Sequence, residues 1–133
     1  TRWSLNYRHF STKLTKTLFK HYSQVTELTM KALDTKDEFN TFINSDAGKL
    51  FVIDFWAEWC GPCRIIGPKF EEMSKEFSDA SFAKVNVDDA DEISEDHGVS
   101  ALPTFLLFKN GKKIAEVIGA SEEKLRETIK SNM

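Results

Sequence analysis

The chain has 133 residues, of which 41% are hydrophobic, so it is long enough for one globular domain with a core to which 11 phenylalanines contribute. Its net charge is −3, but residues 1–29 carry five Lys or Arg against one acid, and residues 30–133 carry thirteen against twenty. We expect no nucleic-acid surface on so acidic a domain, and no membrane span, because no apolar run approaches the roughly 18 residues that a spanning helix needs.

Residues 1–29 form a basic leader that differs from the rest of the chain. Its first acidic residue is Glu27, and its lysines and arginines are interleaved with Ser, Thr and aromatic residues. This composition is typical of a mitochondrial transit peptide, and residues 8–11 (Arg-His-Phe-Ser) resemble a site at which such peptides are cleaved. A disordered extension has the same composition, so a mitochondrial location and a cytoplasmic one both stay open. We assign residues 30–133 to a separate domain.

The domain alternates between strand and helix patterns. We expect strands over residues 28–33, 50–56, 81–87, 104–109 and 112–118. We expect helices from the Thr35 cap to Gly48, from residues 60–62 to about residue 77, over residues 90–97, and after the Ser121 cap. Asn110-Gly111 is a strong hairpin signal, which makes the last two strands antiparallel, whereas strands separated by helices pair in parallel. The sequence therefore predicts an α/β fold with a mixed five-stranded sheet flanked by four helices.

Cys60 and Cys63 are the two cysteines of the chain, and they follow its most strand-like run, residues 50–56. Cysteines so close together cannot tie distant parts of a fold, so their role is local chemistry. The predicted helix start places Cys60 where unpaired N–H groups favour a thiolate, the form that attacks disulfides. We therefore assign Cys60 as the nucleophile and Cys63, one turn on and pointing inward, as the resolving thiol.

Four neighbouring residues support this chemistry. Gly61 lets the turn pass close to a substrate, and Pro62 removes an N–H group and stiffens the pair. Asp54 lies six residues before Cys60 on a buried strand, so desolvation should raise its pKa and let it exchange a proton with Cys63. Lys84, on the neighbouring strand, is expected to pair with Asp54. The alternatives are a structural carboxylate for Asp54 and a solvated strand residue for Lys84.

Other uses of the cysteine pair have less support. Two cysteines at this spacing can form half of a zinc site, but no second pair exists, and His9, His21 and His97 are not spaced as ligands. A haem attachment needs a histidine after the second cysteine, where this chain has Arg64. We therefore predict no metal site.

Residues 52–63 (VIDFWAEWCGPC) resemble the active-site block of the thioredoxin family. The resemblance continues through Pro68, Lys84, Pro103-Thr104, residues 108–111 (FKNG) and Gly119-Ala120, and it covers residues 30–133. It implies the thioredoxin fold and a monomeric protein disulfide reductase. Such a reductase needs no bound cofactor and receives electrons from NADPH through a thioredoxin reductase.

The resemblance also implies a substrate-binding surface. Leu102-Pro103 is expected to be a cis bond beside the disulfide, with the Leu102 backbone receiving an extended substrate as an added strand. Trp59, Leu102, Gly119 and Ala120 would form the apolar part of this surface. Two alternatives stay open: an oxidase or isomerase module of the same fold, against which Gly61-Pro62 argues, and a non-catalytic binding subunit that uses the same surface.

Overall fold

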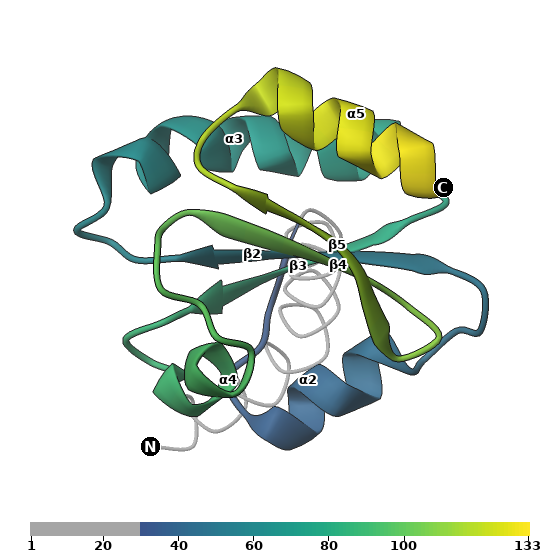
Figure 1. The fold of residues 1–133 in the computed structure, drawn as a ribbon, viewed down its shortest axis with the longest axis horizontal. Helices are drawn as coiled ribbons and strands as arrows, with labels where there is room; N and C mark the ends of the chain where they lie inside the picture. The colour runs from purple at the N-terminus through teal and green to yellow at the C-terminus, as the bar shows by residue number, and fades with distance from the viewer. Residues whose placement is uncertain (1–29) are drawn as a thin grey trace, which may run out of the picture.

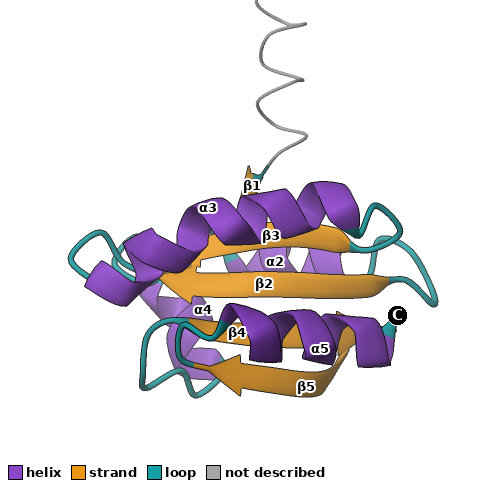
Figure 2. Ribbon diagram, turned by 90° about the horizontal axis from the view of Figure 1, so that it is seen from above, coloured by secondary structure: helices purple, strands orange, loops and turns teal. Residues whose placement is uncertain are grey.

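The computed structural model describes residues 30–133. Its elements in chain order are β1 (Lys31–Ala32), α2 (Lys36–Ile43), β2 (Leu50–Trp56), α3 (Gly61–Glu76), β3 (Ser81–Asn86), α4 (Asp91–Asp96), β4 (Thr104–Lys109), β5 (Lys112–Ile118) and α5 (Glu122–Asn132). The five strands form one sheet in the order β1-β3-β2-β4-β5 (Figure 2). The predicted α/β architecture, with five strands and four helices in this domain, is therefore confirmed.

Strand β2 lies at the centre of a mixed sheet. It pairs in parallel with β3 and antiparallel with β4, while β1 adds in parallel to the other side of β3. The hairpin between β4 and β5 is antiparallel, as predicted, and its turn places Asn110 at φ 54° and Gly111 at φ 75°. Positive φ at both positions is what a two-residue hairpin turn requires.

The helices cover both faces of the sheet. Helices α3 and α5 lie on one face, and α2 and α4 on the other (Figure 1). Each face has its own apolar cluster, because β2 and β4 bury side chains on both sides. One cluster includes Phe39, Phe55, Ile93 and Phe108, and the other includes Phe70, Phe82, Phe105, Leu125 and Ile129.

Short polar interactions start the helices where the sequence predicts. Thr35 Oγ1 accepts a hydrogen bond from the Glu38 N–H group at 3.1 Å, and Ser121 Oγ accepts one from the Lys124 N–H group at 3.2 Å. Each satisfies a donor that has no partner within the first turn. Among residues 30–133, no helix is long and apolar enough to cross a membrane.

The structure corrects three predicted boundaries. Helix α2 ends at Ile43 and does not continue to Gly48, because Asn44 Nδ2 and Ser45 Oγ hydrogen-bond to carbonyl groups of the preceding turn. Such local bonds compete with helix continuation. Strand β3 ends at Asn86, one residue early. In the first strand only Lys31–Ala32 is regular, and residues 28 and 29 of that prediction lie outside the described residues.

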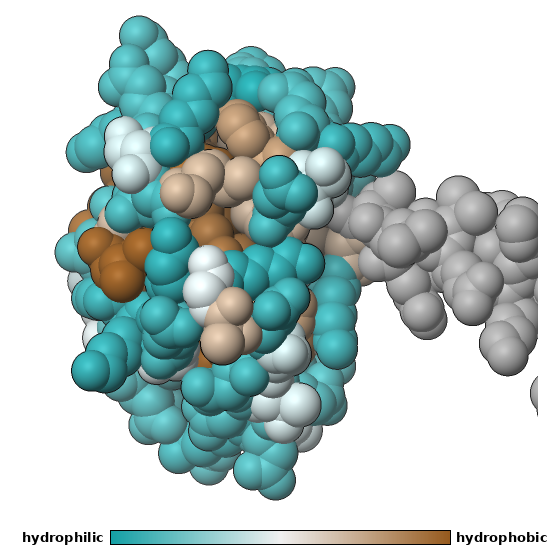
Figure 3. All heavy atoms as spheres, turned by 90° about the vertical axis from the view of Figure 1, so that its right-hand side faces the viewer, coloured by the Kyte–Doolittle hydropathy of each residue, from teal (hydrophilic) through white to brown (hydrophobic). Residues whose placement is uncertain are grey.

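The two ends of the domain differ. The C-terminal end of β2 carries the loop with both cysteines. The opposite end is mostly hydrophilic, and its apolar side chains appear in small separate areas (Figure 3). In the sequence around the cysteines, the large apolar side chains that are exposed are those of Trp59 and Ile65, at 70% and 71%.

Candidate active site

The loop between β2 and α3 positions the two sulfurs. Its N–H group at Cys60 donates to the Ala57 carbonyl at 3.2 Å, and Cys60 itself is the N-cap of α3. Cys60 and Cys63 form a disulfide with their Cα atoms 5.3 Å apart. Both are buried among Ala57, Trp56 and Leu102, although Cys60 retains 6% exposure. The fold therefore places a disulfide at the start of a helix.

The helix start favours a negative charge on the first sulfur. The Cys63 N–H group donates to Cys60 Sγ at 3.2 Å, as it would to any N-cap acceptor. Helix α3 is 16 residues long and has no acidic residue in its first turn, so no side chain competes for the positive end of its dipole. In the reduced protein the same N–H group and dipole would stabilise a Cys60 thiolate.

Asp54 is a fully buried carboxylate on β2. It is 0% exposed, and neither of its oxygens has a hydrogen-bond partner. Desolvation raises the pKa of Asp54 to about 7, and the positive charge of Lys84 opposes that rise. A carboxyl group with such a pKa can hold or release a proton at neutral pH.

Lys84 lies beside Asp54 but does not form the expected direct ion pair. The two residues are register partners across β2 and β3, yet no contact within 4 Å joins their charged groups. The Lys84 ammonium instead lies over the ring of Trp56, with Nζ 4.9 Å from the ring centroid. Its effect on Asp54 is therefore a longer-range electrostatic one.

The loop before β4 approaches the disulfide from the other side. The Leu102-Pro103 bond is cis, as the resemblance implied, and Leu102 packs against the cluster that contains both cysteines. The Pro103 carbonyl accepts from the Gly119 N–H group at 2.9 Å, which ties the end of β5 to this loop. Leu102 thus lies against the cysteines, Gly119 is joined to the neighbouring Pro103, and Ala120 is exposed.

Two features of this surface were missed by the sequence reasoning. Trp59 Nε1 donates to Asp88 Oδ2 at 2.9 Å, so an acid after β3 holds the exposed indole beside Cys60. Ile65, 71% exposed in the second turn of α3, adds a second apolar side chain near the cysteines. The available signal was the pair Ile65-Ile66, because two consecutive isoleucines in a helix cannot both point into the core.

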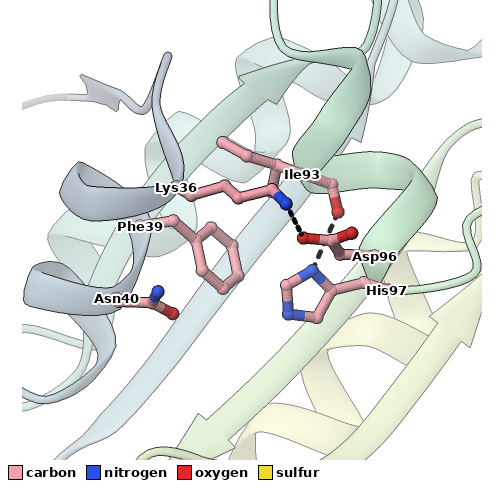
Figure 4. Close-up of a pocket in the computed structure, with 6 residues that line it drawn as sticks. All are labelled: Lys36, Phe39, Asn40, Ile93, Asp96 and His97. Carbon is pink, nitrogen blue, oxygen red and sulfur yellow. Dashed lines mark hydrogen bonds and ion pairs between the residues drawn. The ribbon is translucent and has the colours of Figure 1, made fainter.

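A small pocket lies on the face of the sheet that α2 and α4 cover, between these two helices (Figure 4). Its volume is about 30 Å³, room for a few water molecules at most. Lys36 Nζ and Asp96 Oδ2 form an ion pair of 2.8 Å at its rim, and His97 Nδ1 lies 2.8 Å from the Ile93 carbonyl. The half-buried His97 ring packs 4.6 Å from that of Phe39, centroid to centroid, so this histidine lies against the edge of the core. Within residues 30–133, no three His, Cys, Asp or Glu side chains gather as metal ligands.

Comparison with known proteins matches the same part of the chain. The family model described as Thioredoxin matches residues 30–131. Thioredoxin-1 of Schizosaccharomyces pombe is 48% identical over 104 residues, which cover 78% of this chain and 99% of that protein. Thioredoxin-1 of Saccharomyces cerevisiae is 44% identical over 98 residues, 74% of this chain and 93% of that protein.

Solved structures agree with this match. The crystal structure of Fasciola hepatica thioredoxin has a TM-score of 0.77 and 45% identity, and covers 78% of this chain and 100% of its own. Mitochondrial thioredoxin 3 of Saccharomyces cerevisiae, in its oxidised form, has a TM-score of 0.73 and 35% identity, over 77% of this chain and 95% of its own. With the Cys60–Cys63 pair at the start of α3, these matches show that the chain belongs to the thioredoxin family and is a protein thiol-disulfide oxidoreductase.

Proposed function

We propose that Cys60 attacks and Cys63 resolves in the reduction of protein disulfides. The Cys60 thiolate attacks one sulfur of the substrate disulfide, forms a mixed disulfide and releases the other substrate sulfur as a thiolate, which takes up a proton. The Cys63 thiolate then attacks Cys60 Sγ, and the second substrate thiol leaves. The two electrons of the dithiol pass to the substrate, and the Cys60–Cys63 disulfide remains. The observation that supports this order is the hydrogen bond from the Cys63 N–H group to Cys60 Sγ at the start of α3.

Asp54 is the proposed proton relay for the second step. Its pKa of about 7 lets it take the proton of Cys63 as the thiolate forms and return it later, directly or through water. Lys84 is a positioning residue in this proposal, because its charge keeps that pKa from rising further.

Substrate is proposed to bind across the surface of Trp59, Gly61, Pro62, Leu102, Pro103, Gly119 and Ala120. An extended segment would pair with the Leu102 backbone as an added strand, and Trp59 would provide an exposed ring for apolar contact. The hydrogen bond to Asp88 fixes that ring before substrate arrives.

Trapping of substrates tests the two sulfur roles. The Cys63→Ser variant should accumulate mixed disulfides with substrate proteins, because the resolving step is lost while the attack remains. The Cys60→Ser variant is the matched control and should accumulate none. Equal trapping by both variants, or trapping by Cys60→Ser alone, would reverse or remove the assignment.

The electron donor is proposed to be NADPH, acting through a thioredoxin reductase. The cycle itself uses two sulfurs and calls for no bound cofactor. Consumption of NADPH by a purified thioredoxin reductase should then depend on this protein, with insulin as the final acceptor. The Cys60→Ser/Cys63→Ser variant serves as the blank, and consumption equal to that blank would contradict the proposed donor.

A mitochondrial location is proposed for the full chain. Its basis is the basic composition of residues 1–29 and the presence of a mitochondrial thioredoxin among the similar structures. Fusion of residues 1–29 to a fluorescent protein should direct it to mitochondria, and a fusion with the five Lys and Arg replaced by Gln should not. A diffuse cytosolic signal from the unchanged leader would favour the cytoplasmic alternative.

A further inference from the structure

Ile65 has no part in the proposed cycle, although among residues 30–133 it is the most exposed of the large apolar side chains, at 71%. It lies in the second turn of α3, five residues after Cys60. The core contacts of this helix are made from its other side, by residues such as Ile66 and Phe70. Packing of α3 against the sheet therefore does not use Ile65.

Helical spacing shows what lies beside Ile65. Pro62, a residue of the proposed substrate surface, is three positions before it, and Lys69 is four positions after it, so these residues share one side of α3. Lys69 Nζ forms an ion pair of 2.9 Å with Oε2 of Glu122, the first residue of α5. Helices α3 and α5 begin at the same end of the sheet (Figure 1), and Ala120 is two residues before Glu122. Ile65 therefore extends the proposed substrate surface along α3, on the side that faces the start of α5.

Arg64 adds a positive charge next to Ile65. Its side chain is exposed, and within the part of the chain that the structure describes its guanidinium has no hydrogen bond or ion pair. Lys69, in contrast, is already paired with Glu122. An acidic group on a bound segment could therefore pair with Arg64 without displacing an existing partner.

The surroundings of Arg64 are acidic. The loops after β2, β3 and β5 and the loop before β4 lie at one end of the sheet, because β4 alone among these strands runs in the opposite direction. These loops and the helix starts beside them, residues 57–65, 88–92, 98–103 and 118–123, hold seven Asp or Glu and one cation, Arg64. The end as a whole attracts basic substrates, and Arg64 reverses that preference at one point.

We propose that Ile65 and Arg64 form a second substrate subsite, which takes an apolar side chain and a neighbouring acidic side chain of a protein disulfide. The subsite rests on the proposed function, because it acts on substrates that Cys60 attacks. Five residues of helix span ~7.5 Å along the axis, and an extended substrate covers that distance in about two residues. The side chains that reach the subsite are therefore those about two or three residues from the substrate cysteine.

Single-turnover reduction of designed peptides by the reduced protein tests the subsite. Each substrate is a symmetric dimer of one peptide with a single cysteine, so attack on either sulfur gives the same product. Leu stands two residues from the cysteine on both sides, and the next residue outward is Glu in one dimer and Lys in the other. The wild-type protein should reduce the Glu dimer ~3-fold faster than the Lys dimer, which is the size of effect that an exposed ion pair gives. The acidic end alone predicts the opposite order.

Two pairs of variants separate the subsite from general effects. Arg64→Glu should reverse the preference, whereas Lys112→Glu, which makes the same change of charge at the far end of β5, should keep it. Ile65→Ala should slow both dimers by ~3-fold and leave dimers with Gly in place of Leu unchanged, because less apolar area is buried. Ile114→Ala, a change at another exposed isoleucine, should leave all the rates unchanged.

Three results would overturn the proposal. These are an equal or faster reaction of the wild type with the Lys dimer, the same preference in Arg64→Glu and Lys112→Glu, and unchanged rates for Ile65→Ala. Effects of Arg64→Glu and Ile65→Ala that are confined to the KM for a purified thioredoxin reductase would also overturn it, with the reductase as the occupant. Effects confined to dimerisation, measured by sedimentation, would do so with a second copy as the occupant.

The small neutral disulfide of 2-mercaptoethanol distinguishes a failure of the subsite from a failure of the redox assignment. If Cys60 is not the attacking sulfur, the Cys60→Ser variant should attack this disulfide as the wild type does. If only the subsite is absent, Cys60→Ser should be inactive, while the wild type shows no preference for the Glu dimer. The preference is a ratio of two rates for the same protein, so a change in the reactivity of Cys60 cancels from it.

Discussion

Asp54 and Lys84 are register partners on adjacent strands, but the Lys84 ammonium lies over the ring of Trp56 and forms no ion pair with the carboxylate. Asp54 is therefore buried without any direct partner, in a place where its ionised form is costly. That cost is what gives it a pKa near neutrality. The same cost lowers the free energy of unfolding at alkaline pH, where Asp54 must ionise inside the folded protein.

Replacement of Asp54 should stabilise the protein above neutral pH. The pKa of Asp54 rises from 3.8 to about 7 on folding, so between these values the unfolded state loses a proton that the folded state keeps. The stabilisation that comes from keeping Asp54 protonated in the folded state is therefore fully present below pH 3.8. It falls as the pH rises and is lost once the pH has passed through 7. The Asp54→Asn variant has no such loss. Its free energy of unfolding should therefore exceed that of the wild type by on the order of 4 kcal/mol at pH 8.

Urea denaturation of the oxidised protein at pH 5 and pH 8 measures this advantage. The wild-type protein should lose stability relative to Asp54→Asn between the two values. Equal pH dependence of the two proteins would show that Asp54 is not buried in the manner described. Glu72→Gln, a change at an exposed acid of α3, is the matched control and should follow the wild type.

Removal of the Lys84 charge should raise the pKa of Asp54 further above 7. Desolvation is the larger influence on Asp54, and Lys84 is the one that opposes it. A titration of the Asp54 carboxyl carbon by NMR should therefore show an upward shift in Lys84→Gln and a smaller one in Lys84→Arg, which keeps the charge. An unchanged or lower pKa in Lys84→Gln would mean that the cation–π contact isolates the ammonium from Asp54.

Gly111 should tolerate a side chain less well than Gly98. Both have positive φ, 75° and 66°, so alanine costs ~1 kcal/mol at either position. A Cβ atom at Gly111 would also collide with Asn44 Oδ1, while Gly98 has open space. Asn44 would then lose its 2.8 Å bond to the Asn40 carbonyl.

We expect Gly111→Ala to destabilise the domain by ~1 kcal/mol more than Gly98→Ala. Thermal or urea unfolding measures both. In an Asn44→Ala background the difference should disappear, since the colliding atoms are gone. A difference that persists there would place its cause in the hairpin backbone.

Much of this architecture could be predicted from residue patterns. The run over β2 indicates a strand buried on both faces, and Asn110-Gly111 indicates the hairpin between β4 and β5, because each signal arises within a few residues. The early end of α2 was missed, since it depends on side-chain bonds from Asn44 and Ser45 that compete with the helix. Helical spacing alone does not show which of two competing local structures is the more stable.

The site was predictable to the extent that backbone position decides it. Cys60 at a helix start and Asp54 on a buried strand follow from sequence spacing. The partner of Lys84 does not, because a long flexible side chain beside both an acid and an aromatic ring can be drawn to either. Asp88 was missed for a similar reason: its bond to Trp59 joins residues 29 positions apart in two loops.

Insulin reduction in the presence of dithiothreitol tests the central claim most directly. The wild-type protein should accelerate the appearance of turbidity well above the dithiothreitol background, because its two sulfurs carry electrons to the insulin disulfides. The Cys60→Ser variant, with the same surface and fold, should return the rate to that background. Equal acceleration by the wild type and by Cys60→Ser would contradict the assignment of Cys60 as the attacking sulfur.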